Sequence, residues 1–300
     1  MAYRINFKHP FQREVRSIAS EQLAIAIDFL EEQPDGPHEA IHKARRRIKR
    51  TRALYRLCAQ GAKGFARTET ERLGKIAGRL AHLRDAAALT ETVEYIKTEI
   101  DEPSIQMAFD KLGSVLTRRR DQMMIDEVRI SDAISDAVIN LQQARNALAD
   151  LNLPERNTKV ADCLATGWRS TGSKAMEALI DCADNQEGAA YHELRKRGQD
   201  RWMHAALLRR LWPSAMQAIR IETEALISHL GHEHDLAMLS AHLAETNDLE
   251  ESHAEKDILL LAVFEQRQRL QKTCREAAEL VFDDRPERDA ARIRLLVREM

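Results

Sequence analysis

Apolar residues recur along most of the chain at intervals of three and four, the spacing that places them on one side of an α-helix. Four such stretches occur in the first half, and corresponding stretches follow from Val160 onward. The pattern therefore predicts about four helices in each half. The stretches of the first half are Val15 to Leu30, His42 to Cys58, Thr68 to Lys97 and Ile105 to Asp126.

Helix-breaking residues separate these stretches. No long run of alternating β-branched residues is present, and Gly and Pro number only 11 and 7, so a β-sheet is not expected. Nor does a low-complexity linker divide the chain. We predict an all-α fold in which two helical bundles pack together as a single domain, residues 1–300. The expected breaks are Pro34–Pro37, Gly61–Gly64, Asp101–Pro103, Asn152–Pro154 and Asp184–Gly188, with Pro213 interrupting or restarting a helix.

Two segments recur at a fixed distance, which indicates an internal duplication. Ile41–Arg47 resembles Tyr191–Arg197, and Leu80–Asp85 resembles Leu230–Asp235. The offset is 150 residues in both cases, and each half separates its His from its Asp by 43 residues. Two matches in one register are hard to explain by chance. We therefore divide the chain into two repeat halves, 1–150 and 151–300.

The helix expected after His42 carries a row of basic residues. At about 100° per residue its members fall within an arc of roughly 80°, and they span a rise of about 21 Å. No acidic residue lies between the ends of the row, so its charge is not neutralised within the helix. A long, linear polyanion fits this geometry. The row consists of His42, Arg45, Lys49, Arg52 and Arg56, and the adjoining apolar arc consists of Ile41, Ala44, Ile48, Thr51, Tyr55 and Cys58.

The second half repeats only the beginning of this row. His192 and Arg195 occupy the equivalent positions, but Gln199 and Trp202 stand where the first half has Lys49 and Arg52. The second basic face should therefore be weaker. Other cations lie beside these rows, and Arg210 returns to the side of the second row two turns later. The 150-residue offset also pairs Arg119 with Arg269, each in the last helix expected for its half. The candidate phosphate-binding residues are His42, Arg45, Arg46, Lys49, Arg52, Arg56, Arg119, His192, Arg195, Lys196, Arg210 and Arg269.

Composition restricts how the chain can attract an anion and where it resides. The formal net charge is −2, so polyanion binding must arise from segregated charge. Four scattered cysteines form no zinc-like or C-x-x-C spacing, and we expect reduced thiols in the core. No signal-like or membrane-spanning run is visible, which favours a cytoplasmic protein.

The paired motifs resemble those of the CHAD family, the conserved-histidine α-helical domain. His42–Arg52 and His192–Arg197 resemble its H-x-x-R helices. Leu230–Leu239 closely resembles its L-G-x-x-H-D-L-x-x-L segment, and Leu80–Leu89 resembles it more loosely. The resemblance covers nearly the whole chain and implies two pseudo-twofold-related bundles around a central basic groove or pore that binds inorganic polyphosphate. Members of this family occur alone or fused to a triphosphate tunnel domain, and some associate with polyphosphate granules. Because nothing in the sequence resembles that β-rich domain, we expect a stand-alone member.

A metal site is the first alternative, because His229, His232, His234 and Asp235 are clustered. Such a site would suit a metal-binding phosphohydrolase. On a helix, however, His232 and His234 would point about 160° apart, unlike the i, i+4 pair of helical metal sites. We therefore expect Asp235, and Asp85 in the first half, to pair with the basic helices.

Nucleic-acid binding is the second alternative, because a basic row does not distinguish one polyanion from another. The 3 Trp, 4 Tyr and 7 Phe argue weakly against base stacking. A scaffold role through the acidic tracts Glu245–Glu255 and Asp283–Asp284 is a third. No nucleophile with its base, cofactor signature or metal motif is visible, so we expect a polyphosphate-binding protein that is not an enzyme and needs no cofactor. The oligomeric state stays open.

Overall fold

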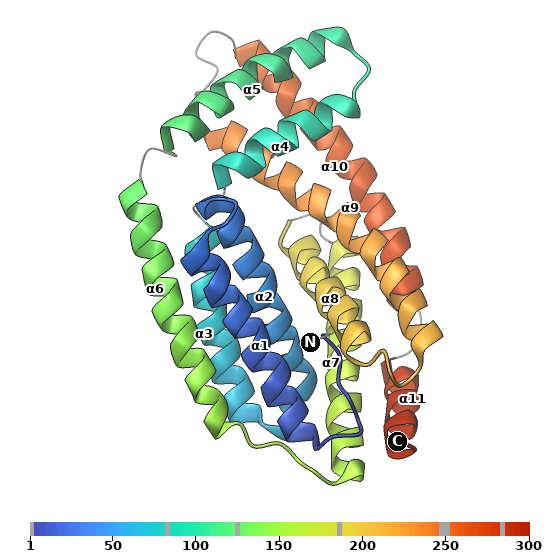
Figure 1. The fold of residues 1–300 in the computed structure, drawn as a ribbon. Helices are drawn as coiled ribbons and strands as arrows, with labels where there is room; N and C mark the ends of the chain where they lie inside the picture. The colour runs from blue at the N-terminus through green and yellow to red at the C-terminus, as the bar shows by residue number, and fades with distance from the viewer. Residues whose placement is uncertain (1–2, 82–84, 124–126, 185–187, 246–252, 283–285) are drawn as a thin grey trace.

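The computed structural model describes residues 3–81, 85–123, 127–184, 188–245, 253–282 and 286–300. Within these ranges the chain forms eleven α-helices and two short 3-10 helices and no strand, so the predicted all-α class is confirmed (Figure 1). The α-helices are α1 (Phe11–Glu32), α2 (Pro37–Cys58), α3 (Lys63–Ala81), α4 (Asp85–Thr98), α5 (Pro103–Met123), α6 (Glu127–Asn146), α7 (Asn157–Asp184), α8 (Gly188–Leu207), α9 (Pro213–Glu245), α10 (His253–Phe282) and α11 (Pro286–Arg298).

The expected breaks all separate helices, but the expected number of helices was too low. Residues 1–150 hold six described α-helices and residues 151–300 hold five, rather than about four each. The stretch Thr68–Lys97, expected as one helix, is divided into α3 and α4. Residues 82–84 contain no Gly or Pro and lie outside the described residues. The same holds for most of the first acidic tract, residues 246–252, and for both residues of the second, 283–284. The apolar period continues across residues 82–84, so the sequence did not reveal the division.

One helix start recurs with the spacing seen in the sequence. Helix α9 starts at Pro213, 150 residues after the start of α3 at Lys63. The single helix α9 thus spans the positions that α3 and most of α4 occupy in the first half.

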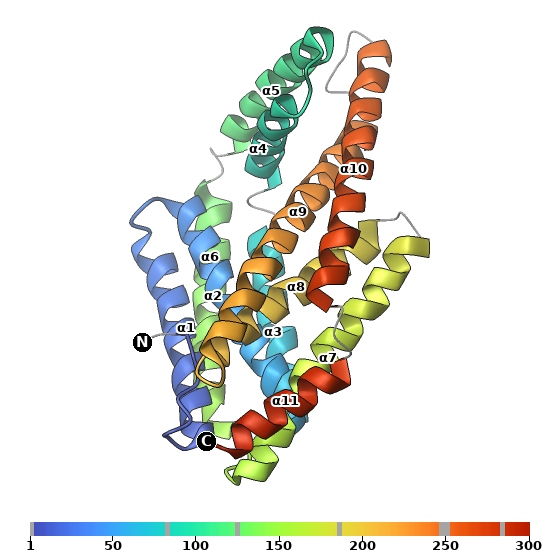
Figure 2. The same ribbon diagram turned by 90° about the vertical axis from the view of Figure 1, so that its right-hand side faces the viewer.

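The two halves are not self-contained bundles. Helices α1, α2, α3 and α6 pack side by side, and α7, α8, α9 and α10 pack beside them (Figures 1 and 2). Helices α4 and α5, however, leave the first group and pack on α9 and α10, where Val93 and Phe109 share a buried cluster with Leu236 and Leu239. The largest apolar cluster also joins helices of both halves, from α1 and α2 to α7 and α11. Burying the apolar faces of α4 and α5 therefore requires the second half of the chain.

The four cysteines are buried free thiols, as expected. None of the helices in the described part of the chain is both long and apolar enough to span a membrane.

Helices α2 and α7 approach closely at Gly167. A Cβ atom at this position would lie 2.7 Å from the carbonyl carbon and 2.8 Å from the Cα of Leu57. These are backbone atoms, which cannot move aside without separating the helices. We therefore expect Gly167→Ala to lower the free energy of unfolding by about 3 kcal/mol in urea denaturation, the cost of overpacking a rigid contact.

The control is Gly64→Ala, also in a helix, where an added Cβ would meet no atom within 4 Å. This variant should be as stable as the native protein or slightly more so. Equal stability of the two alanine variants would contradict the close approach of α2 and α7.

Candidate functional site

Helix α2 has the two faces that its sequence predicts. It follows Gly36, whose φ of 84° suits glycine, and Pro37 occupies its first turn. The residues of the predicted apolar arc are all buried, each at most 3 % exposed. The basic residues beside them are only half-buried, so the row flanks the core, as expected.

Helix α8 repeats the burial pattern of α2. Between residues 41–58 and 191–208, buried, half-buried and exposed positions follow in the same order with one exception. Arg50 is half-buried, whereas Asp200 at the equivalent position is buried. Both helices thus present their basic residues from the same side of the buried face.

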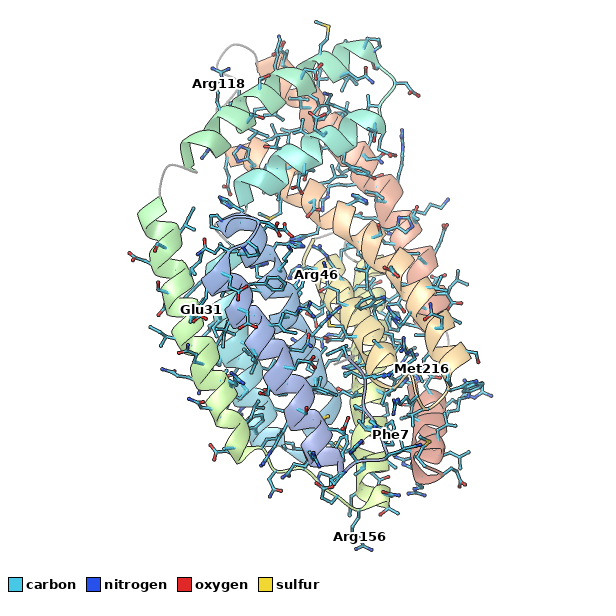
Figure 3. All side chains as sticks on the ribbon, viewed as in Figure 1. Phe7, Glu31, Arg46, Arg118, Arg156 and Met216 are labelled. Carbon is cyan, nitrogen blue, oxygen red and sulfur yellow. The ribbon has the colours of Figure 1, made fainter. Side chains whose placement is uncertain are left out.

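These residues line one cavity of about 480 Å³ between α2, α3, α8 and α9, with a contribution from α4. We call it the basic cavity. In Figure 3, Arg46 lies at the side of α2 that faces α8. The lining residues that carry ionisable groups are His42, Arg45, Arg46, Lys49, Arg52, Arg56, Glu91, His192, Arg195, Lys196, Asp200, His234 and Asp235.

Small residues of α3 leave room for this cavity. Gly74, Ala77, Gly78 and Ala81 line it, and their spacing of three, four and seven places them on one helix face. A Cβ at Gly74 would lie 3.3 Å from Nη2 of Arg52. The sequence shows these small residues at helical spacing, but it does not indicate that they face α2.

The cavity holds an excess of positive charge. Its lining has seven Lys or Arg side chains and three carboxylates, which gives a formal charge of +4 when the histidines are neutral. Burial lowers the pKa of Arg52 to about 10, with repulsion from Arg56 and Arg197 acting in the same direction and Asp200 opposing it. Burial also lowers the pKa of Arg195. The cations therefore lie where water solvates them incompletely and where they repel one another.

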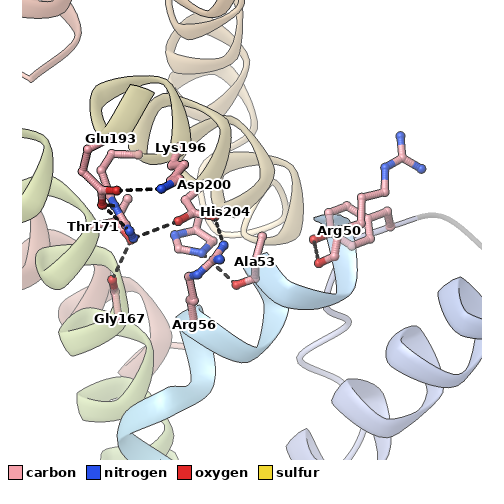
Figure 4. A network of polar contacts seen from close by, with 11 residues as sticks. Arg50, Ala53, Arg56, Gly167, Thr171, Glu193, Lys196, Asp200 and His204 are labelled. Carbon is pink, nitrogen blue, oxygen red and sulfur yellow. Dashed lines mark hydrogen bonds and ion pairs between the residues drawn. The ribbon is translucent and has the colours of Figure 1, made fainter. Parts of the chain in front are cut away.

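A buried carboxylate, that of Asp200, binds Arg56. The Nη1 atom of Arg56 lies 2.6 Å from Oδ1 of Asp200, and Arg197 lies 3.2 Å from the other carboxylate oxygen (Figure 4). Arg197 and Lys196 also contact Glu193. The sequence analysis missed Asp200. The 150-residue offset aligns this residue with Arg50, and an acidic residue at a basic position of the repeat could have identified it. This ion pair joins α2 to α8 at one end of the row.

Three further arginines of the cavity, Arg45, Arg52 and Arg195, differ in their hydrogen bonding. Arg45 donates a hydrogen bond to the carbonyl oxygen of Ala77. The Nε atoms of Arg52 and Arg195 are buried and have no hydrogen-bond partner among the described residues. Asp235 lies in the same cavity, and its charge acts to raise the pKa of Arg195, which agrees with the pairing expected for it. The side chain of Asp85 lies outside the described residues.

The clustered histidines of α9 point toward different helices. The ring of His234 lies 5.0 Å from that of His192 on α8, whereas His232 stacks on Tyr95 of α4 at 4.0 Å. In the described ranges, no three His, Cys, Asp or Glu side chains are grouped to hold a metal ion. Burial, followed by Lys196 and His234, lowers the pKa of His192 to about 4. The two histidines facing each other are therefore elements of the basic cavity.

Nine of the twelve candidate residues line the basic cavity, and three lie elsewhere. Arg119 is on α5, which packs on α10 at the end of the molecule where Figure 3 labels Arg118. Arg210 follows α8 and donates a hydrogen bond to Asn6, and Arg269 is exposed on α10. Arg119 and Arg269 are paired by the 150-residue offset, and Arg210 returns to the side of the second basic row. None of the three shares the site, because helical spacing does not specify which neighbour a helix face meets.

His204 gives the fold a dependence on pH. It is fully buried, its Nε2 lies 2.9 Å from the Ala53 carbonyl oxygen, and burial lowers its pKa to about 4. An unfolded histidine titrates near 6.5, so below this pH the unfolded chain binds a proton that the native protein excludes. We expect this residue to reduce the free energy of unfolding by about 2 kcal/mol as pH falls from 7 to 5.

Urea denaturation of the native protein and His204→Gln at both pH values checks this expectation. His192 contributes in the same direction, so the variant should retain part of the dependence but show a smaller change. An unchanged dependence in His204→Gln would contradict the assignment.

The model of the CHAD domain matches residues 18–244 of the 300-residue chain. No curated protein matches the sequence.

Proposed function

Because the chain belongs to the CHAD domain family, a domain associated with polyphosphate binding, we propose that the basic cavity binds inorganic polyphosphate. The observation that carries this proposal is the convergence of α2 and α8, distant in sequence, on one cavity with a formal charge of +4. A chain of phosphates compensates closely spaced cations along its whole length. Arg offers a planar pair of donors, Lys a point charge, and His a donor whose charge depends on pH.

The basic cavity is, in this proposal, the central groove of a duplicated domain. The 150-residue offset between the starts of α3 and α9 and the shared burial order of α2 and α8 support a pseudo-twofold relation between the halves. The crossing of α4 and α5 to the second half supports a single domain. The protein acts as a binder of polyphosphate rather than as an enzyme that turns it over, and granules rich in polyphosphate are its expected location.

The competing polyanion is nucleic acid, and a displacement assay separates the two. Labelled long-chain polyphosphate is bound to the protein and titrated with single-stranded RNA or duplex DNA at equal phosphate concentration. We expect unlabelled polyphosphate to displace the label far better than either nucleic acid, because its phosphates follow one another without intervening sugars. Equal displacement by RNA or DNA would reject the specific assignment.

A further inference from the structure

A second pocket of about 220 Å³ opens beside the basic cavity. The two share Arg46 and Lys49 from α2 and Gln199 and Met203 from α8, so they are contiguous. We call the second one the side pocket. Its remaining lining residues are Arg50 from α2, Trp202 from α8, and Glu224 and Ile227 from α9.

The side pocket contains both substitutions that weaken the second basic row. Gln199 takes the position that Lys49 has in the repeat, and Trp202 takes that of Arg52. The two residues lie three positions apart on α8 and therefore share one helix face. They place an amide and an indole next to the end of the cationic surface. The repeat thus indicates that this part of α8 has different ligand chemistry from α2.

The lining of the side pocket suits a flat ring with polar edges at the end of a phosphate chain. Met203 and Ile227 supply apolar walls, and the carboxylate of Glu224 offsets part of the positive charge of Arg46, Lys49 and Arg50. The indole Nε1 of Trp202 has no hydrogen-bond partner among the described residues, and the guanidinium of Arg220 lies 4.8 Å from the indole ring centre. Aromatic and Arg planes stack on nucleobases, while Gln and Glu match their donor and acceptor edges.

We infer that the side pocket takes the base of a nucleoside polyphosphate whose phosphate chain lies in the basic cavity. This inference rests on the proposed function, because it uses the same cationic surface. Arg46 and Lys49, which line both spaces, hold the phosphates nearest the nucleoside. One pocket for one base beside a continuous cationic surface fits a terminal nucleoside, whereas single-stranded RNA would bring a base with every phosphate.

Calorimetric titration with ATP and with inorganic tripolyphosphate tests the inference, since the two ligands have the same number of phosphates. We expect the native protein to bind ATP about tenfold more tightly, the usual contribution of stacking one base. Trp202→Ala should remove this preference and leave the affinity for tripolyphosphate unchanged. Trp202→Phe, which retains an aromatic ring, should keep most of it, and Trp212→Ala, which alters an exposed tryptophan that does not line the side pocket, should keep all of it.

Several results would overturn the inference. The first is an equal affinity of the native protein for ATP and tripolyphosphate. The second is an equal decrease in the affinities for both ligands in Trp202→Ala. The third is tighter binding of an oligoadenylate than of ATP at equal phosphate concentration. If tripolyphosphate and long-chain polyphosphate both bind while ATP has no advantage, only this inference fails. If no phosphate chain binds the native protein, the proposed function fails with it.

Discussion

Replacing Arg45, Lys49 and Arg52 together with alanine should weaken polyphosphate binding by about 100-fold or more, if each charge-assisted contact contributes about 1 kcal/mol or more. All three line the basic cavity, and Arg52 in particular is held there against the cost of burial and the repulsion of Arg56. An anion relieves both penalties. Titration with long-chain polyphosphate at fixed salt measures the loss.

Two further triple variants separate position from charge. Replacing Arg195, Lys196 and Arg197 should cause a smaller loss, because Glu193 and Asp200 already pair with Arg197. Replacing Arg118, Arg269 and Lys272, which do not line the basic cavity, removes the same charge and should change the affinity by less than about twofold. Equal losses in all three variants would mean that net charge, and not the cavity, governs binding.

Raising the salt concentration from 50 to 200 mM should reduce the affinity for polyphosphate by about 10³-fold. Seven Lys or Arg side chains line the basic cavity, and each phosphate neutralised on a flexible strand contributes about −0.7 to the slope of log affinity against log salt. The expected slope is therefore near −5. Affinity measurements at four or more salt concentrations give it directly.

The salt response of the variants provides the control. The triple variant of Arg45, Lys49 and Arg52 should lose about 2 from the slope, whereas the variant outside the cavity should retain the native slope. A native affinity that is insensitive to salt would contradict a binding mode based on counterion release.

Helical periodicity predicted the fold class and the positions of the breaks, because Pro and Gly mark them in the sequence. It also predicted the buried face of α2 and the half-buried row beside it. What it missed depends on contacts between distant segments. The division of Thr68–Lys97 into α3 and α4 follows from the packing of α4 and α5 on α9 and α10, which no local pattern encodes.

The part of the site that lies on the two repeated segments could be predicted from the sequence. The match of Ile41–Arg47 with Tyr191–Arg197 identified α2 and α8, and the structure brings their cations to one cavity. Arg119, Arg210 and Arg269 were included because their spacing agreed, yet they lie elsewhere. Asp200 was missed because a single acidic residue in a basic helix has meaning only once Arg56 lies opposite it.

The proposed function requires that a chain of phosphates lies in the basic cavity and compensates its cations. A crystal structure of the protein with a polyphosphate of defined length tests it most directly. We expect phosphate oxygens within hydrogen-bonding distance of Arg45, Lys49 and Arg52 from α2 and of Arg195 from α8. Phosphates bound instead around Arg119 and Arg269, with the cavity filled only by water, would contradict it.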